Sequence, residues 1–250
     1  MMWVGLERMY LVPPGELVVS LFKASRDLTA KVVTLRTLRY SFGCPDEDLT
    51  AYRADDSGIG AKPLPGFEGF DPSARLFHIQ HRDLQTMLMG TPLNVMTERF
   101  IGLFIRRLEA TDRVKPGDEW TTIPDLYDFL KTEMFRAALT ALCGTAIFDV
   151  APDVGAHFWA FDASIATLFK RIPRIFARKQ YAARDTVLED VRKWHAHARA
   201  NFDWNDKEAV DAEWEPLYGA RLMRARQVMW DGIGQSEDGR AANDLGMMWA

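Results

Sequence analysis

Apolar residues recur three or four positions apart along most of the chain, which is the spacing of one face of an α-helix. Clear stripes lie in the segments 31–42, 92–109, 124–144 and 181–202. Shorter ones occupy 14–24, 152–172 and 218–230, and helical periodicity also returns after residue 75. The pattern predicts about nine helices. Since residues 7–12 alternate only loosely, as a short strand would, we expect a mainly α fold with minor β structure near the N-terminus.

Proline and glycine fall where these helices are expected to begin and end. Pro14 and Pro92 suit the first turn of a helix, because proline has no amide hydrogen to donate and its φ angle is already helical. Gly144 suits the end of the helix predicted over 124–144, where a left-handed residue is common.

The helical periodicity fails between residues 44 and 73, where glycine, proline and aspartate are frequent. We expect nearly all of this segment to form one extended loop. A loop of this length inside a compact domain is commonly a lid, a binding loop or a linker. The alternative, to which we give equal weight, is a surface loop that has no functional role.

Residues 243–250 have the pattern of a helix that begins to bury an apolar face. Asn243 is expected to cap this helix, and Asp244 suits the positive end of the helix dipole. Leu245, Met247 and Met248 would form the apolar face. An isolated helix of two turns is marginal in water. We therefore expect 243–250 to start a long central helix of a larger protein.

The composition is typical of a globular chain, because 48% of its 250 residues are hydrophobic and 26% are charged. We treat residues 1–250 as one domain. A net charge of −4 without a basic block gives no reason to expect nucleic acid as a partner. We expect no membrane span, because no apolar stretch approaches the roughly 20 residues that a span needs.

Residue chemistry alone predicts no complete catalytic centre. Cys44 and Cys143 lie far apart in sequence and favour buried, reduced thiols. His78 and His81 could share a helix face, but no further ligands are in view and we expect no metal site. The Gly-x-Gly pairs lack the strand and third glycine of a phosphate loop, and no Gly-x-Ser-x-Gly elbow is present.

The order of several segments resembles the cytochrome P-450 haem-thiolate monooxygenases. The resemblance is greatest to the eukaryotic branch that contains sterol hydroxylases and prostacyclin synthase. The segments that carry it are 10–17, 22–28, 81–98, 158–162, 172–173 and 244–250. Each segment by itself matches the family pattern only loosely. The resemblance rests on the order of the segments along the chain. The resemblance implies an incomplete cytochrome P-450-like multi-helix domain.

The resemblance also implies a cofactor, partners and a site. Full-length relatives would hold haem, accept electrons from a reductase at the endoplasmic reticulum membrane, and insert one oxygen atom from O2 into a lipophilic, sterol-like or fatty substrate. His81 and Arg82 would contact a haem propionate, or serve only as polar residues on a helix surface. The loop 44–73 would cap the substrate pocket. Residues expected to line that pocket are Phe67, Phe70, Phe158, Phe161, Met247 and Met248.

The chain departs from the family in three respects. The segments that carry the resemblance include neither the family's Glu-x-x-Arg helix nor the Phe-x-x-Gly-x-x-x-Cys-x-Gly loop that supplies the haem thiolate. Phe77 and His81 stand at the spacing of the usual Trp-x-x-x-Arg. We therefore expect a fragment that binds no haem alone. The alternatives are a non-enzymatic α-helical interaction protein and an inactive truncated product.

Overall fold

The computed structural model describes residues 2–4, 7–24, 29–111, 113, 117 and 120–249. Residues 25–28, which belong to one segment of the predicted resemblance, and Ala250 at the end of another lie outside the described residues.

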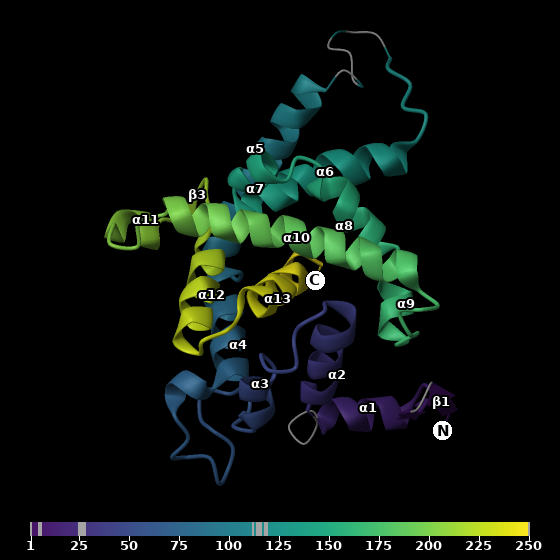
Figure 1. The fold of residues 1–250 in the computed structure, drawn as a ribbon, viewed down its shortest axis with the longest axis vertical. Coiled ribbons are helices and arrows are strands. Elements are labelled where there is room, and N and C mark those ends of the chain that lie inside the picture. Colours follow the sequence, from purple (N-terminus) through teal and green to yellow (C-terminus); the bar gives the residue numbers. More distant parts are fainter. Residues whose placement is uncertain are drawn as a thin grey trace.

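The fold is mainly α, as predicted (Figure 1). The helices of the described residues are α1 (Glu16–Lys23), α2 (Lys31–Arg36), α3 (Thr50–Ala54), α4 (Leu76–Met87), α5 (Thr91–Ala110), α6 (Leu126–Cys143), α7 (Ala146–Val150), α8 (Val154–Asp162), α9 (Ile165–Phe169), α10 (Arg178–Asn201), α11 (Lys207–Asp211), α12 (Arg221–Gly232) and α13 (Glu237–Trp249). A π-helical turn over Thr37–Ser41 extends α2, and a 3₁₀ turn over Pro72–Ala74 precedes α4.

The β structure of the described residues consists of two short antiparallel pairs. Strand β1 (Met2–Val4) pairs with β2 (Glu7–Met9), with Met2 opposite Met9. Strand β3 (Trp214–Glu215) pairs with β4 (Gly219–Ala220), with Trp214 opposite Ala220. The strand predicted over 7–12 therefore ends earlier, at Met9.

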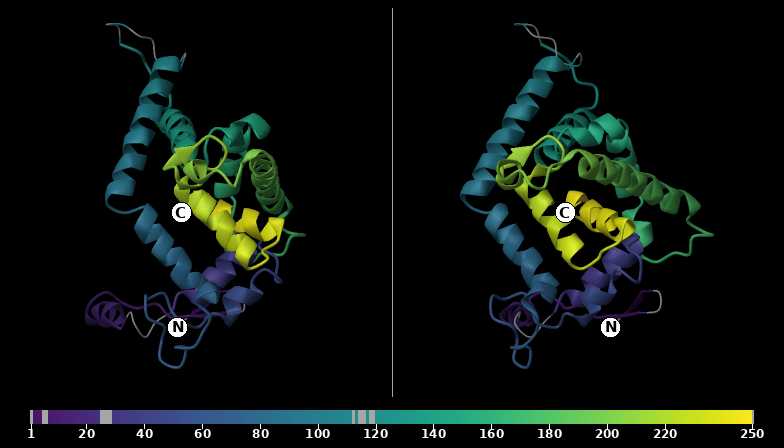
Figure 2. Two further views of the ribbon diagram at one scale, coloured as in Figure 1. Left: turned by 90° about the vertical axis from the view of Figure 1, so that its left-hand side faces the viewer. Right: turned by 60° about the vertical axis from the view of Figure 1, so that its left-hand side comes forward.

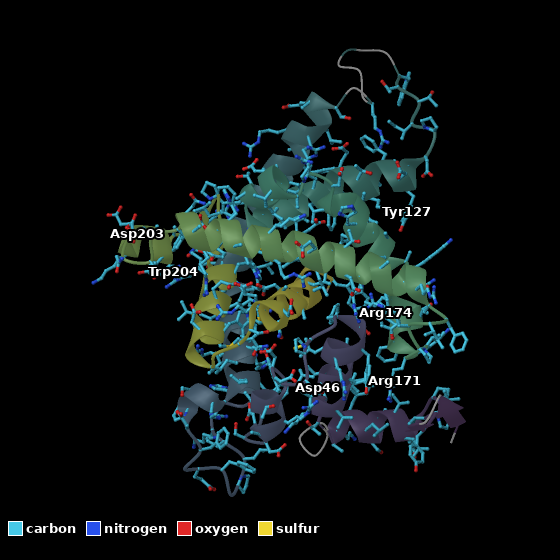
Figure 3. All side chains as sticks on the ribbon, in the orientation of Figure 1. Asp46, Tyr127, Arg171, Arg174, Asp203 and Trp204 are labelled. Atoms are coloured by element: carbon cyan, nitrogen blue, oxygen red, sulfur yellow. The ribbon has the colours of Figure 1, made fainter. Side chains whose placement is uncertain are left out.

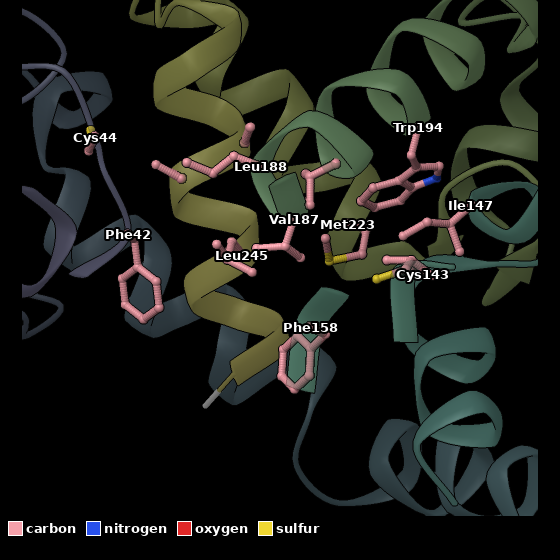
Figure 4. Packing of buried hydrophobic residues seen from close by; sticks show 14 of the residues in the cluster. Phe42, Cys44, Cys143, Ile147, Phe158, Val187, Leu188, Trp194, Met223 and Leu245 are labelled. Atoms are coloured by element: carbon pink, nitrogen blue, oxygen red, sulfur yellow. The ribbon is translucent and has the colours of Figure 1, made fainter. Parts of the chain in front are cut away.

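The core is organised around α10, which packs against α7, α8 and α13. Its buried face repeats at helical spacing and includes Val187, Leu188, Val191, Trp194 and Ala198. Figure 4 shows several of these side chains converging with residues of α6, α8, α12 and α13. The indole Nε1 of the fully buried Trp194 donates to the carbonyl of Leu217 over 2.7 Å, so its one polar atom is paired.

Two glycines allow α6 and the β3–β4 turn to meet backbone to backbone. Gly144 ends α6 with φ +83°, as predicted, and Gly219 has φ +77°. A Cβ atom on Gly144 would overlap the Pro216 carbonyl, and one on Gly219 would overlap the backbone of residues 142–144. Both the left-handed conformation and the close approach therefore require glycine here.

The outer helices bury little. In the described chain neither α1 nor α5 contains a buried residue. Leu17 and Phe22 on α1 are 60% and 77% exposed, and Ile101 and Ile105 on α5 are each about half exposed. Figure 2 shows α4 and α5 together along one side of the molecule, away from the α10 core.

The prediction of an extended loop over 44–73 is wrong in part, because residues 50–54 form α3. Leu49 and Tyr52 are fully buried and anchor this turn of helix against the rest of the molecule. The turn carries too few apolar residues to show a period, so local sequence could not reveal it.

The prediction that the last helix starts at Asn243 is also wrong. Helix α13 begins at Glu237, and the Ser236 hydroxyl caps it by accepting a hydrogen bond from the Gly239 amide at 3.1 Å. Asn243 lies inside the helix, where its side chain donates to the Gly239 carbonyl at 2.8 Å. The first turns of α13 are rich in glycine and charge, so they do not show an apolar stripe. Ala241 and Ala242 are nonetheless fully buried.

Candidate functional site

A cavity of about 420 Å³ lies between α4, α11 and α12. This volume is within the range of pockets that hold small organic ligands, roughly 300–1,000 Å³. One face of α12 forms a long wall, through Arg221, Arg224, Ala225, Val228, Met229 and Ile233. Their spacing of three or four residues is why a single helix face can line the whole length of the cavity.

Helix α4 and the α11 region supply the remaining walls. Ile79, Arg82, Asp83 and Met87 come from α4, and Trp204, Val210 and Asp211 come from the segment that contains α11. Figure 3 places Trp204 beside α11. Figure 1 shows α4 and α12 running in opposite directions. The end of α4 therefore lies toward the start of α12.

The cavity lining contains two ion pairs. Arg82 Nη2 lies 2.7 Å from Asp83 Oδ1, and Arg221 Nη2 lies 2.8 Å from Asp211 Oδ1. Both guanidinium groups are about half exposed, whereas Asp83 is nine-tenths buried. The Arg221–Asp211 pair is exposed on both sides and so contributes only about 0–1 kcal/mol, whereas Arg82 neutralises a largely buried carboxylate.

Arg224, which also lines the cavity, has a structural role. Its buried guanidinium donates to the carbonyls of Val210, Ala212 and Gly219, and its Nη1 lies 3.2 Å from the Glu215 carboxylate. Burial lowers the pKa of Arg224 from its ordinary value, and Glu215 opposes this shift. Arg224 therefore fixes the chain between α11 and α12, and these contacts use four of its five N–H donors.

A second polar cluster lies at the centre of α13. The Asp244 carboxylate is fully buried and accepts hydrogen bonds from Arg226 Nε at 2.6 Å and Gln227 Nε2 at 2.9 Å. His195 Nε2 of α10 lies 3.0 Å from the same carboxylate. Burial by itself raises the pKa of Asp244, but Arg226 and His195 outweigh it and hold the pKa below its usual value.

Hydrogen bonds extend this cluster to α3 and to α4. Arg226 also donates to the Asn243 carbonyl at 3.0 Å, and the Tyr52 hydroxyl donates to Asn243 Oδ1 at 3.1 Å. Gln80 of α4 donates to the Tyr52 hydroxyl at 2.6 Å. Sequence reasoning missed this network. The available signal was the pair of adjacent polar residues Arg226 and Gln227 within a predicted helix.

The structure does not gather the predicted pocket residues in one place. Phe67 and Phe70 contact each other edge to face in the loop, with ring centroids 6.1 Å apart. Phe158 and Phe161 belong to the α10 core, and Met247 and Met248 pack against that core. None of these six lines the α4–α12 cavity described above. Their role toward a substrate stays a prediction.

The predicted haem contacts both lie on α4. Arg82 lines the cavity and pairs with Asp83, and His81 is half-buried one residue earlier. The contact of each side chain with a haem propionate stays a prediction. Of the two predicted residues, Arg82 lines the cavity together with apolar side chains.

The described residues do not fit the iron of a haem-thiolate centre. Cys44 is 3% exposed, and burial, followed by Asp48, raises the pKa of its thiol to about 12. Cys143 is fully buried beside Met223 and Ile147 (Figure 4), and burial raises the pKa of its thiol well above its ordinary value. A thiolate ligand must be deprotonated. Neither sulfur lines the cavity, so neither is suited to ligate iron.

No set of three or more histidine, cysteine, aspartate or glutamate side chains among the described residues could hold a metal ion. No helix in the same part of the chain has the length and apolar character needed to cross a bilayer.

Comparison with known proteins identified three fungal relatives. The chain is 32% identical over 243 residues to cytochrome P450 monooxygenase efuG of Hormonema carpetanum, covering 96% of this chain and 40% of that protein. It is 28% identical over 243 residues to cytochrome P450 monooxygenase fsoE of Humicola fuscoatra, covering 96% and 39%. It is 29% identical over 222 residues to cytochrome P450 monooxygenase calL of Penicillium decumbens, covering 88% and 40%.

No family model and no solved structure matches the chain. The three relatives support the resemblance to cytochrome P450 monooxygenases and do not bear on the sterol hydroxylase and prostacyclin synthase branch. The chain spans about 40% of the length of the curated relatives it matches. It is therefore related in sequence to the cytochrome P450 monooxygenases along nearly all of its own length.

Proposed function

We propose that the 250 residues form part of a haem-dependent monooxygenase, whose whole chain inserts one oxygen atom from O2 into a lipophilic substrate. The observation that carries this proposal is the 32% identity over 96% of the chain to a cytochrome P450 monooxygenase. Haem supplies the oxygen chemistry in such enzymes, and the protein supplies position and environment. A reductase as electron donor, a sterol-like or fatty substrate, and residence at the endoplasmic reticulum membrane belong to the same proposal.

The part played by these residues would be to build the helical frame around the pocket. The core around α10 fixes α8, α12 and α13 relative to one another. The Asp244 network ties α13 to α10, α12 and, through Tyr52, to α4. Such a helical frame would hold side chains in position around the haem, and the haem would supply the oxygen chemistry.

The first test is spectroscopic. The purified 250-residue chain is reconstituted with haem, reduced and exposed to carbon monoxide. We expect no Soret band of the haem-thiolate type, because both cysteines are buried as thiols. Such a band would show that the chain supplies the thiolate alone and would contradict its proposed part in the enzyme.

The second test reads the coding sequence that follows the codon for Ala250. A frame that continues into a Glu-x-x-Arg segment and a cysteine loop would support the proposal, and its product should give the haem-thiolate Soret band. A frame without them would favour the non-enzymatic interaction protein. The comparisons favour the monooxygenase over that alternative.

A further inference from the structure

We propose that the connection between α3 and α4 moves in two parts, a fixed base and a movable tip. The base comprises residues 55–61, which close around the Arg75 side chain. The tip comprises residues 62–71, which carry Phe67 and Phe70. The tip opens and closes as a lid while the base stays in place. Its use as a gate for a substrate rests on the proposed function, whereas the two-part motion does not.

Arg75 holds the base closed from the inside. Its side chain is 5% exposed, and its Nε donates to Ser57 Oγ at 3.0 Å. Its Nη1 donates to the Ala61 carbonyl at 2.9 Å, and its Nη2 donates to the Gly60 carbonyl at 2.6 Å. A buried guanidinium needs such acceptors, because they replace the hydration that the charge has lost. Opening the base would break these bonds together, so the closed base is strongly favoured.

The base is also fixed to the first turn of α4. Asp55 is 1% exposed, and its carboxylate accepts from the Ser57 hydroxyl at 2.6 Å and from the Phe77 amide at 3.0 Å. The first amides of a helix have no partner within the helix, so Asp55 satisfies one of them. The Phe77 ring packs edge to face on the buried Tyr52, with centroids 5.6 Å apart. The base is therefore expected to move only with α4.

The tip is held mainly by itself. In the part of the chain that the structure describes, the hydrogen bonds of residues 62–70 run to other residues of the same loop. The Leu64 amide donates to the Ser57 carbonyl at 2.9 Å, and the Phe70 amide donates to the Phe67 carbonyl at 3.0 Å. Figure 1 shows this connection extending beyond the helices at the lower end of the molecule. Opening such a segment costs little free energy, because few contacts are lost.

The test is electron paramagnetic resonance of nitroxide labels on the base and on the tip of the purified 250-residue chain. Ile59→Cys labels the base at a side chain that is 56% exposed, and Gly69→Cys labels the tip where a Cβ atom meets no neighbour within 4 Å. Cys44 and Cys143 are buried and should stay unlabelled. We expect reorientation at position 69 to be faster than at position 59 by at least about threefold. Equal mobility at the two positions would overturn the proposal.

Variants of Arg75 test what holds the base. Arg75→Gln removes the charge, and Arg75→Lys keeps it but loses the planar fork that reaches several acceptors. Both should raise the mobility at position 59 toward that at position 69, and leave position 69 unchanged. Arg53→Gln is the matched control, because Arg53 pairs with the exposed Asp46 just before the loop. It should change neither label. Unchanged mobility at position 59 in both Arg75 variants would exclude the role of this arginine.

A further variant keeps the test decisive if the Arg75 variants do not fold, which circular dichroism melts would reveal. Ser57→Ala removes both the acceptor of Arg75 Nε and the hydroxyl donor to Asp55. It should mobilise position 59 without affecting position 69. A Ser57→Ala chain in which position 59 stays immobile would contradict the proposed base. These results do not depend on haem, so they stand or fall separately from the Soret spectrum of the proposed enzyme.

Discussion

Asp244 is a fully buried carboxylate, although its position in the sequence suggested the first turn of a helix. It lies instead two turns inside α13, against Arg226, Gln227 and His195. A buried charge is tolerated only when it is paired and hydrogen-bonded. Each member of this cluster therefore depends on the others, and the loss of one leaves an uncompensated polar group in the core.

We predict that Asp244→Asn lowers the free energy of unfolding by about 3–5 kcal/mol, because Arg226 would stay buried without its counter-charge. The measurement is urea denaturation followed by circular dichroism. Asp238→Asn on the same helix is the control. Its pair with Arg192 is 59% exposed on the aspartate side, and its loss should cost about 1 kcal/mol or less. Similar losses in the two variants would contradict the stabilising role of the buried pair.

The buried Asp244 carboxylate should also make the free energy of unfolding depend on pH in the acid range. The folded-state pKa of Asp244 is depressed, so its contribution is fully present above the unfolded pKa of about 3.9 and is lost as the pH falls through the folded value. The unfolding free energy of the wild-type chain should therefore decline below about pH 4 more steeply than that of Asp244→Asn. Parallel pH profiles for the two chains would show that another carboxylate governs acid unfolding.

At the scale of elements, the contact between α6 and the β3–β4 turn is a meeting of two backbones. Gly144 and Gly219 both have left-handed φ angles and face each other without side chains. Gly102 differs, because it lies inside α5 with open space where a Cβ atom would project. The same substitution should thus have opposite effects at the two kinds of position.

We expect Gly102→Ala to raise the free energy of unfolding by about 0.5–1 kcal/mol, since alanine loses less backbone entropy in a helix. Gly144→Ala should lower it by more than that amount, through both strain and overlap with the Pro216 carbonyl. Thermal melts of both variants provide the comparison. A stabilising Gly144→Ala would rule out the close approach between these backbones.

The whole molecule combines a dense core with sparsely packed outer helices. Buried apolar residues concentrate around α10, α12 and α13, whereas α1 and α5 have none among the described residues. Helices that bury little open at low free-energy cost, because few contacts are lost. The free energy of local unfolding should therefore be lower for α1 and α5 than for α10 and α13.

Hydrogen exchange read by mass spectrometry tests that division. We predict slow exchange in peptides from α10 and α13, and exchange faster by at least about tenfold in peptides from α1 and α5. Protection of α1 equal to that of α10 would reveal a contact that covers its exposed Leu17 and Phe22.

The sequence by itself determined that the fold is mainly α, and it located most of the helices. Helical periodicity and terminal glycine or proline residues act through neighbours within about four positions, so they can be read locally. The order of the motifs also indicated the cytochrome P-450 resemblance that three relatives support. The helix end at Gly144 followed from local chemistry in the same way.

Only the tertiary structure decided where α13 begins, that residues 50–54 are helical, and that Asp244 is buried. It also decided that Arg82 and Arg221 line one cavity while the six predicted pocket residues lie elsewhere. Each of these features depends on partners distant in sequence, such as Tyr52 and Asn243 or Arg226 and Asp244. Burial of a polar group becomes favourable only once such partners meet, and a local pattern carries no information about that meeting.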